Sequence, residues 1–416
     1  MSMKKLLGIL VCVIFLTACA QAEDPVQRAD AAVRQSSEPA ATEEVNAEIS
    51  TPQPDASYEP AVLYVLFINV GYGDAALIVY QGRAVMIDTG AKAAAPALFT
   101  ALNYMGVTVL DAVFLTHTHA DHVGGMEALG GNIPIADVYV AAYSHNKKSG
   151  KNTVIELCRE LALPLTRLNA GDAASFGEGL RFEVLGPLVN SAGDDNDNSL
   201  VLLLTMAGRR LLFTGDMQFE EEGTLLDAGQ DVSADVLKVG NHGNPDATSE
   251  AFGAAVSPSV AVISTSTIDD DDSANPRVIE ALPTAEIYVT QDFPLGVLLC
   301  VDEAGTITVS SPAGARSDAK LEMALDASTQ LVTITNTGAA EADLSGFVLF
   351  SERGGECFWF PAHARLAPGV CLTVSGAWGG GDYEFVGESK PWNTKKGDAA
   401  LLYDAGGHLI ARVSAP

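Results

Sequence analysis

Between Ala61 and Ser310, short apolar runs with strand character alternate with segments of helical spacing, and this alternation stops near residue 318. The run LDAVFLTH, residues 110–117, is almost wholly apolar, which is typical of a strand buried on both faces. The segment APALFTALNYMG has helical spacing and ends at Gly106, where a glycine commonly caps a helix. Strands that alternate with helices predict a layered α/β domain, which we place at residues 60–312.

The remaining segment, residues 319–416, shows no helical period. Short β runs such as LVTITNTG and GFVLFSE are separated by Gly, Pro and Asn. This pattern and length are typical of an immunoglobulin-like β-sandwich, which predicts an all-β second domain. Cys357 and Cys371 flank a turn-containing stretch, and the sequence leaves open whether they form a disulfide.

The N-terminus has the character of a processing signal. Two lysines precede the apolar run Leu6 to Leu16, which is too short to span a bilayer. The run ends in LTAC, which resembles a bacterial lipobox and implies cleavage after residue 18 and acylation of Cys19. An ordinary signal peptide with a chance cysteine is the alternative. Residues 19–59 are rich in Ala, Glu, Pro and Ser, which predicts an unfolded linker. We expect an extracytoplasmic protein with a lipid anchor in the bacterial cell membrane, or a secreted one.

Acidic residues dominate the chain, with 53 Asp and Glu against 24 Lys and Arg and a formal net charge of -29. Such a chain repels polyanions at long range, which argues against general nucleic-acid binding. An anionic substrate would need a local positive feature, and a metal site is the clearest candidate. His145 lies in YSHNKKSGK beside three lysines, either in a substrate-facing loop or in a solvated one.

Histidines gather in one short stretch. The chain has seven histidines, and three of them lie with an aspartate in LTHTHADHVGG, residues 115–125. Imidazole and carboxylate groups are ligands that suit zinc, or iron and manganese in dinuclear sites. His117 and His119 follow a buried strand and can point at one ion, while Asp121 and His122 turn toward a second position. The two glycines behind them allow a sharp bend.

Two later residues fit the same site. Asp216 in LLFTGDM and His242 in LKVGNHGN each follow a predicted strand. Sites in open α/β folds form at the carboxyl ends of strands, so we expect these side chains to meet the histidine cluster.

The ordered motifs FINVGYGDAALI, VMIDTG, LTHTHADHVGG, NDNSLVLLL, LLFTGD and DVLKVGNHG resemble those of the metallo-β-lactamase fold superfamily. Within it, they are similar to the hydrolase domain of the competence DNA-uptake channel ComEC. The resemblance implies an αββα sandwich, two divalent ions (Zn²⁺ or Mn²⁺) and catalytic roles for Asp121 and Asp216. It implies the following placement: His117 and His119 on the first ion, Asp121, His122 and His242 on the second, Asp216 between them, and Asp88 behind a ligand histidine.

The chain departs from the superfamily pattern in three places. Many superfamily enzymes supply a third histidine to the first metal, but here that stretch is DDNDNSL, without a histidine. ComEC-like proteins also have Asn-x-x-Ser there, so Asn198 or Asp197 becomes the candidate oxygen ligand. Asn241 replaces the first histidine of a His-His pair. Asn275 stands where a His-Pro is common, which removes a candidate proton donor or phosphate contact.

The segment from residue 320 onward resembles the lamin-tail domain, on the cues Asn-Thr-Gly, Leu-Ser-Gly, Leu-x-Pro-Gly and Trp392-Asn393. Bacterial versions often accompany secreted nucleases and hydrolases, which implies that this module binds a polymer or a partner protein. The resemblances together imply a phosphodiester-cleaving enzyme, whose expected substrate is nucleic acid, such as extracellular DNA, or another phosphodiester. A hydrolase of another ester, lactone or β-lactam, or a non-catalytic metal-retaining protein, are the alternatives. The presence of Asp121, Asp216 and His242 argues against the last of these.

Overall fold

The structure is a computed structural model that describes residues 61–146, 152–192 and 194–415. The predicted signal peptide, the linker and Cys19 lie outside the described residues. Within the described part of the chain, no helix is both long enough and apolar enough to cross a membrane. The described residues belong to one compact unit.

Two mixed sheets stack face to face in the N-terminal part. The first has the order β15-β14-β1-β2-β3-β4-β5-β6 and the second β13-β12-β11-β10-β9-β8-β7. Their facing sides form one apolar layer, in which the rings of Phe114 and Phe182 lie 5.0 Å apart. The strands of the first sheet are β1 Ala61–Ile68, β2 Ala76–Tyr80, β3 Arg83–Ile87, β4 Ala112–Leu115, β5 Val138–Ala141, β6 Leu165–Leu168, β14 Gly296–Asp302 and β15 Ile307–Ser310. Those of the second are β7 Ala173–Phe176, β8 Leu180–Gly186, β9 Val201–Met206, β10 Arg209–Phe213, β11 Val236–Lys238, β12 Val260–Ile263 and β13 Glu286–Val289.

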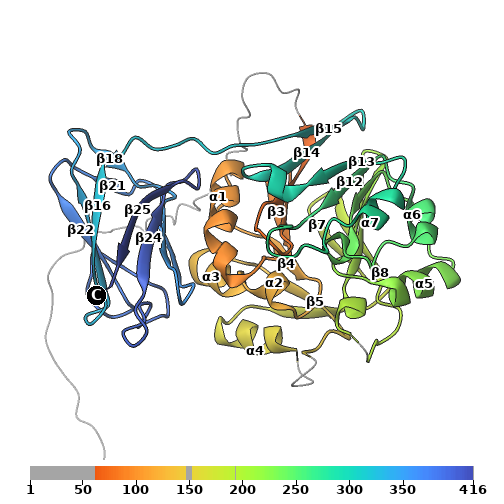
Figure 1. Ribbon diagram of the computed structural model, residues 1–416, viewed down its shortest axis with the longest axis horizontal. Helices are drawn as coiled ribbons and strands as arrows, with labels where there is room; N and C mark the ends of the chain where they lie inside the picture. The colour runs from red at the N-terminus through yellow and green to blue at the C-terminus, as the bar shows by residue number, and fades with distance from the viewer. Residues whose placement is uncertain (1–60, 147–151, 193, 416) are drawn as a thin grey trace, which may run out of the picture. The chain divides into compact units, whose positions relative to one another are not determined.

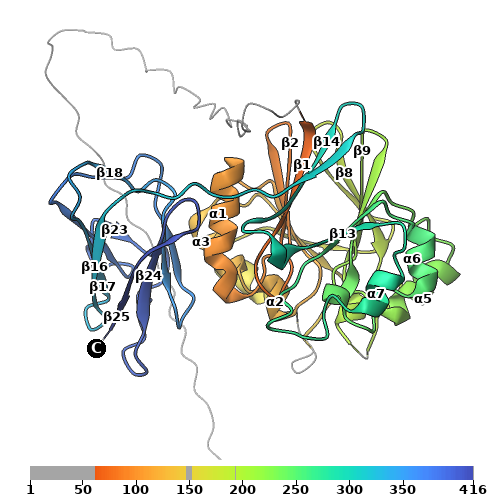
Figure 2. The same cartoon turned by 45° about the horizontal axis from the view of Figure 1, so that its top comes forward.

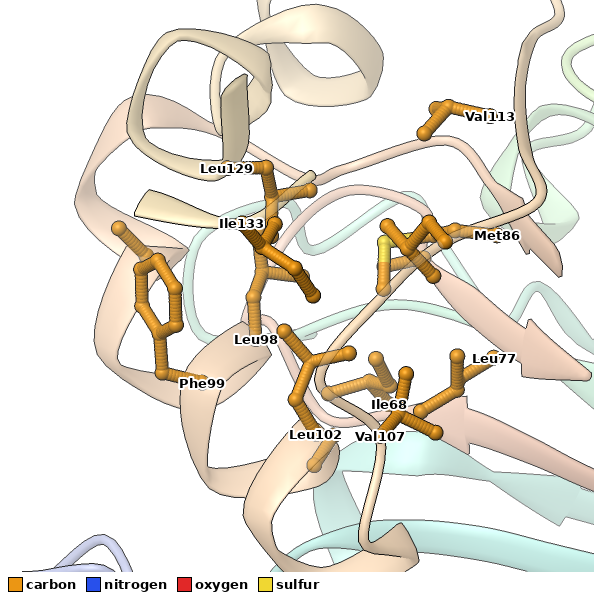
Figure 3. Packing of buried hydrophobic residues seen from close by; sticks show 14 of the residues in the cluster. Ile68, Leu77, Met86, Leu98, Phe99, Leu102, Val107, Val113, Leu129 and Ile133 are labelled. Atoms are coloured by element: carbon orange, nitrogen blue, oxygen red, sulfur yellow. The ribbon is translucent and has the colours of Figure 1, made fainter. Parts of the chain in front are cut away.

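Helices cover the outer faces of both sheets (Figures 1 and 2). On the first sheet, Leu98 and Leu102 of α1 and Leu129 of α3 pack against Leu77 and Met86 (Figure 3). On the second, α5, α6 and α7 bury a separate apolar cluster. The predicted αββα sandwich is therefore confirmed. The helices are α1 Ala95–Met105, α2 Ala120–Val123, α3 Met126–Asn132, α4 Thr153–Glu160, α5 Phe219–Asp227, α6 Glu250–Val256, α7 Pro276–Glu280, and the 3₁₀ turns η1 Lys92–Ala94, η2 Asn196–Asn198, η3 Gly240–Gly243 and η4 Thr290–Asp292.

Parallel strands bring several chain segments to one edge of this sandwich. In the first sheet β3, β4, β5 and β6 run parallel, and in the second β10, β11, β12 and β13 do so. The loops after β3, β4, β10 and β11 carry Asp88, His117, Asp216 and His242. The carboxyl ends of these strands thus position the site.

The C-terminal part is a β-sandwich, as predicted. Its sheets have the orders β16-β17-β22-β23 and β20-β19-β24-β25, with a small pair β18-β21. Trp392, Phe360 and Leu349 lie in the core between the sheets. The strands are β16 Leu321–Asp326, β17 Leu331–Asn336, β18 Ala342–Asp343, β19 Val348–Ser351, β20 Cys357–Trp359, β21 Arg365–Leu366, β22 Cys371–Ser375, β23 Tyr383–Glu384, β24 Ala399–Tyr403 and β25 Leu409–Ser414.

Cys357 and Cys371 are both free thiols. Cys357 is buried on β20, while Cys371 is exposed on β22 of the other sheet. The disulfide that the sequence left open is therefore not formed.

The sandwich shares an apolar core with the helices of the layered part. Val348, Phe350 and Leu401 belong to the same buried cluster as α1 and α3. The side chain of Asn103 donates to the Gly346 carbonyl at 2.7 Å, and that of Asn132 donates to the Cys357 carbonyl at 3.0 Å. Polar and apolar contacts thus join the two parts directly.

Candidate metal centre

Three buried histidine rings converge on one carboxylate. The Nε2 atoms of His122, His242 and His117 lie 3.0, 3.3 and 3.7 Å from Oδ2 of Asp216. Each ring reaches this point from a different segment: His117 follows β4, His122 lies in α2, and His242 lies in the turn after β11. The structure therefore brings together residues that are far apart in the sequence.

These facing atoms have no hydrogen-bond partner. The Nε2 atoms of His117, His122 and His242 and Oδ1 of Asp216 are buried and unsatisfied. Buried polar atoms are almost always hydrogen-bonded, so a cluster of orphans at one point requires an explanation. Imidazole nitrogen and carboxylate oxygen are the donors that Zn²⁺ and Mn²⁺ take in hydrolytic sites. The residues fit divalent metal ions on the Nε2 side of the three rings.

The opposite nitrogen of each ring contacts a supporting group. Nδ1 of His122 lies 2.8 Å from Oδ2 of Asp88, and the same carboxylate accepts hydrogen bonds from the backbone and hydroxyl of Thr116. Nδ1 of His242 donates to the Ser264 carbonyl at 2.9 Å. Such partners fix the ring orientation and leave Nε2 available for a metal.

The donor atoms fall into two groups. In the first, the atoms of His117, His119 and Asp216 lie within 4.8 Å of one another. In the second, those of His122, His242 and Asp216 do so, together with Asp74. We call these the outer and the inner position, because His119 is partly exposed whereas the inner histidines are fully buried.

Asp121 and Asp74 flank the inner position from opposite sides. Oδ2 of Asp121 lies 3.2 Å from Nε2 of His242, on the side where an ion would be held. Asp74 instead approaches Nδ1 of His242, at 3.5 Å. Asp121 is thus placed as a ligand, and Asp74 as a carboxylate behind the ring.

Sequence reasoning missed Asp74 and its partner Lys238. Lys238 is only 4% exposed, forms an ion pair with Asp74, and donates to the Gly215 carbonyl at 3.2 Å. A lysine inside the apolar run DVLKVG was the available signal, because a buried lysine requires a charge partner.

Charge coupling sets the protonation of the cluster. Burial disfavours a proton on His122 and His242, but the surrounding carboxylates together outweigh it, Asp216 with Asp88 at His122 and Asp216 with Asp121 and Asp74 at His242, and raise the pKa of both rings well above 6.5. Burial and the neighbouring His122 instead lower the pKa of His117 to about 3. Burial also works against ionisation of Asp121, yet contact with His242 and the charge of His122 lower its pKa to about 2.

The stretch 194–200 supports the centre from behind. The Asn198 amide accepts a hydrogen bond from the Ser191 backbone and donates to Ser191 and Asp195, so both its ends are engaged away from the histidines. Asp197 accepts from the backbone at the start of α5. The Ser199 hydroxyl lies 3.3 Å from Nδ1 of His117 and accepts from the Asp216 backbone. The two residues predicted as oxygen ligands therefore have other contacts.

Local backbone geometry holds the cluster in place. Gly124 and Gly125 form the turn between α2 and α3 with ordinary helical angles, so close packing rather than a left-handed conformation explains these glycines. A Cβ on Gly125 would lie 2.3 Å from the Thr89 carbonyl oxygen. By contrast, Asp88 and His242 adopt positive φ angles of 55° and 54°, a strained conformation that tends to occur at functional sites.

Residues 68–267 match the family model described as Metallo-beta-lactamase superfamily. The layered part of the chain has the metallo-β-lactamase fold, and members of this superfamily are generally metal-dependent hydrolases. The predicted fold class is thereby confirmed.

Two of the similar curated proteins are competence proteins. ComE operon protein 3 of Bacillus subtilis (strain 168) is 28% identical over 259 residues, covering 58% of this chain and 32% of that protein. Competence protein ComA of Neisseria gonorrhoeae is 33% identical over 198 residues, covering 47% and 26%. The anti-Pycsar protein Apyc1 of Saccharibacillus brassicae is 33% identical over 167 residues, covering 38% and 65%. The matched region thus spans no more than about a third of either competence protein.

Proposed function

We propose that this protein is an extracytoplasmic, membrane-anchored hydrolase that uses two divalent ions to cleave phosphodiesters in nucleic acid. The observation that carries the proposal is the set of orphaned Nε2 atoms around Asp216. Similarity to competence proteins supports nucleic acid as the substrate class. The metal centre would also be the local positive feature that an acidic chain needs to hold an anion.

In this proposal, His117 and His119 would hold one ion, His122, His242 and Asp121 would hold the other, and Asp216 belongs to both groups of donors. Such ions supply Lewis acidity and activation of water at neutral pH. The chain's own contribution is to fix the donors: Asp88 and the Ser264 carbonyl orient the two inner rings, and Ser199 holds the Asp216 backbone.

Tyr72 provides a hydrogen-bond donor at the mouth of this centre. Its ring packs on that of His242, with centroids 4.4 Å apart. Burial, reinforced by the charges of Asp216 and Asp121, raises the pKa of Tyr72 to about 12. Its hydroxyl can donate a hydrogen bond to an anionic substrate oxygen. Asn275, at the position where a histidine is common, instead caps α7 by accepting from the Arg277 backbone.

Two parts of the proposal concern location and partners. Acylation of Cys19 anchors the chain, so Cys19→Ser should release it from membranes into the soluble fraction. Retention of the variant in membranes would contradict the lipid anchor. The C-terminal sandwich acts as a lamin-tail-like module that binds a polymer or a partner protein.

The test compares substrates under defined metal conditions. The purified chain with Zn²⁺ or Mn²⁺ is assayed on single- and double-stranded DNA, bis-p-nitrophenyl phosphate, a lactone and nitrocefin. We expect phosphodiester cleavage that Asp216→Asn reduces by more than about 100-fold, since even partners behind metal ligands contribute roughly 10–100-fold. Asp227→Asn, at an exposed carboxylate at the end of α5, should leave the rate unchanged.

Any other result of this assay would favour a different function for the metal centre. Turnover of the lactone or nitrocefin alone would assign a different hydrolysis. Metal binding without turnover of any substrate would indicate a non-catalytic metal-retaining protein. DNA cleavage that survives Asp216→Asn would come from a contaminating nuclease.

A further inference from the structure

A groove with a volume of about 690 Å³ lies beside the metal centre, in the layered part of the chain. The segment after β5, helix α4 and strand β6 form its walls, with Ser144 and His145 at one side and Arg159 and Arg167 at the other. Asn152, Ile155 and Arg159 are spaced by three and four residues, so α4 presents one face to the groove. Residues from three elements of the described chain thus line the groove.

The charge of this groove differs from that of the rest of the chain. Arg159 and Arg167 are exposed, and neither has a carboxylate partner among the described residues. Several other arginines are paired with carboxylates, as Arg209 is with Asp235 and Arg412 with Glu352. Glu156 also lines the groove, so two guanidinium groups face one carboxylate. Local positive charge on a chain of net charge -29 indicates an anionic ligand.

A buried carboxylate links the groove to the metal centre. Asp195 accepts hydrogen bonds from the His145 backbone at 2.8 Å and from the Ser144 hydroxyl at 2.9 Å. It also accepts from the backbone and hydroxyl of Thr118, at 3.0 and 2.6 Å. Thr118 stands between His117 and His119 in the chain, so one side chain separates the groove from the ligands of the outer position.

We propose that this groove binds the phosphodiester backbone of a nucleic-acid strand that extends away from the bond at the metal centre. The inference rests on the proposed function and deepens it. Guanidinium groups match phosphate oxygens in shape and charge, and they are common in nucleic-acid contacts. The side-chain amide of Asn152 donates to the Ser144 carbonyl at 3.2 Å and fixes the groove wall. A long strand reaches both arginines, whereas a small phosphodiester occupies the centre alone.

The test separates strand binding from turnover. Binding of a fluorescent single-stranded dodecamer with phosphorothioate linkages, which resists cleavage, is measured by anisotropy on the metal-bound chain. At 0.1 M salt, each Arg→Ala change at 159 or 167 should weaken binding about fivefold, since a single-strand contact releases about 0.7 counterion. The double variant should bind about 25-fold more weakly, with a salt slope reduced by about 1.4.

Controls distinguish this inference from the proposed function. Arg316→Ala removes an exposed arginine outside the groove and should leave binding unchanged. Arg159→Ala/Arg167→Ala should raise the KM for an unmodified DNA strand while the kinetics on bis-p-nitrophenyl phosphate stay at the wild-type level. Unchanged strand binding in the double variant would overturn the groove assignment. If the wild type cleaves no phosphodiester, the proposed function fails, and the binding measurement still decides whether the groove holds a strand.

Discussion

The outer and inner metal positions share Asp216 but differ in how they are supported. The inner position has two fully buried histidines, one backed by Asp88 and the other by the Ser264 carbonyl, with Asp74 near both. The outer position has one buried histidine backed by hydroxyl groups, and the partly exposed His119. Carboxylate partners strengthen a histidine ligand more than neutral hydroxyls do. We infer that the inner position binds its ion more tightly than the outer one.

The outer position also lacks the third histidine that many superfamily enzymes supply. The stretch 194–200 supplies Asp195, Asn198 and Ser199 as supports for neighbouring segments. The outer position is therefore left with fewer strong donors. An enzyme with this asymmetry would keep one ion and exchange the other.

The largest expected effect is on the amount of Zn²⁺ that stays bound when one histidine is removed, either from the outer or from the inner position. After dialysis against buffer without metal, His119→Ala should keep about one Zn²⁺ per chain, whereas His242→Ala should keep none, because its loss removes a ligand of the tight position. Elemental analysis of the dialysed protein gives the stoichiometry. His363→Ala, in the β-sandwich, is the matched control and should behave as wild type. If His119→Ala and His242→Ala lost the same amount of Zn²⁺, the inferred difference in affinity between the two positions would be wrong.

A smaller effect is expected from the supporting groups. Asp88→Asn keeps the side-chain shape but removes the charge behind His122, and should lower Zn²⁺ affinity of the inner position by roughly 10–100-fold. Ser199→Ala, which removes the neutral hydroxyl behind His117, should weaken the outer position by less than about tenfold. Competition with a chromogenic chelator measures both. A stronger effect of Ser199→Ala would show that hydroxyl support matters more than carboxylate support.

The smallest expected effect is the number of protons that the protein releases when it binds metal. His122 and His242 have raised pKa values and carry protons in the metal-free chain at pH 7, whereas His117, with a pKa of about 3, carries none. Filling the inner position should therefore release about two protons, and its metal affinity should fall as the pH falls. Calorimetry in buffers of different ionisation enthalpy measures this number. Equal proton release at both positions would contradict the asymmetry.

Sequence patterns predicted the fold because each part had a clear signal. The alternating strands and helices of residues 60–312 indicated layers, and Gly106 caps α1 with a positive φ of 66°, as its sequence suggested. The ordered motifs predicted that His117, Asp216 and His242 would meet, since each follows a buried strand. The lost helical period after residue 318 indicated the β-sandwich.

Other features depend on three-dimensional contacts that no local pattern carries. The Asp74–Lys238 pair joins residues more than 160 positions apart, so only folding shows that each neutralises the other. Asn198 resembled a ligand by its place in the chain, but its amide is engaged by Ser191. The groove arginines lie on separate elements, α4 and β6, and only folding brings both of them to one groove.

The buried Asp74–Lys238 pair has a consequence for the folding of the metal-free chain. In the metal-free chain, Asp74, Asp121 and Asp216 have lowered pKa values, while His122 and His242 have raised ones and Lys238 adds a third cation. Three negative charges thus meet three positive ones, and with the Asp88 carboxylate beside His122 the buried charges are close to balanced without a metal ion. Opposite charges that offset one another inside the protein lower the cost of burying each of them, so folding of this part of the chain does not require a bound ion.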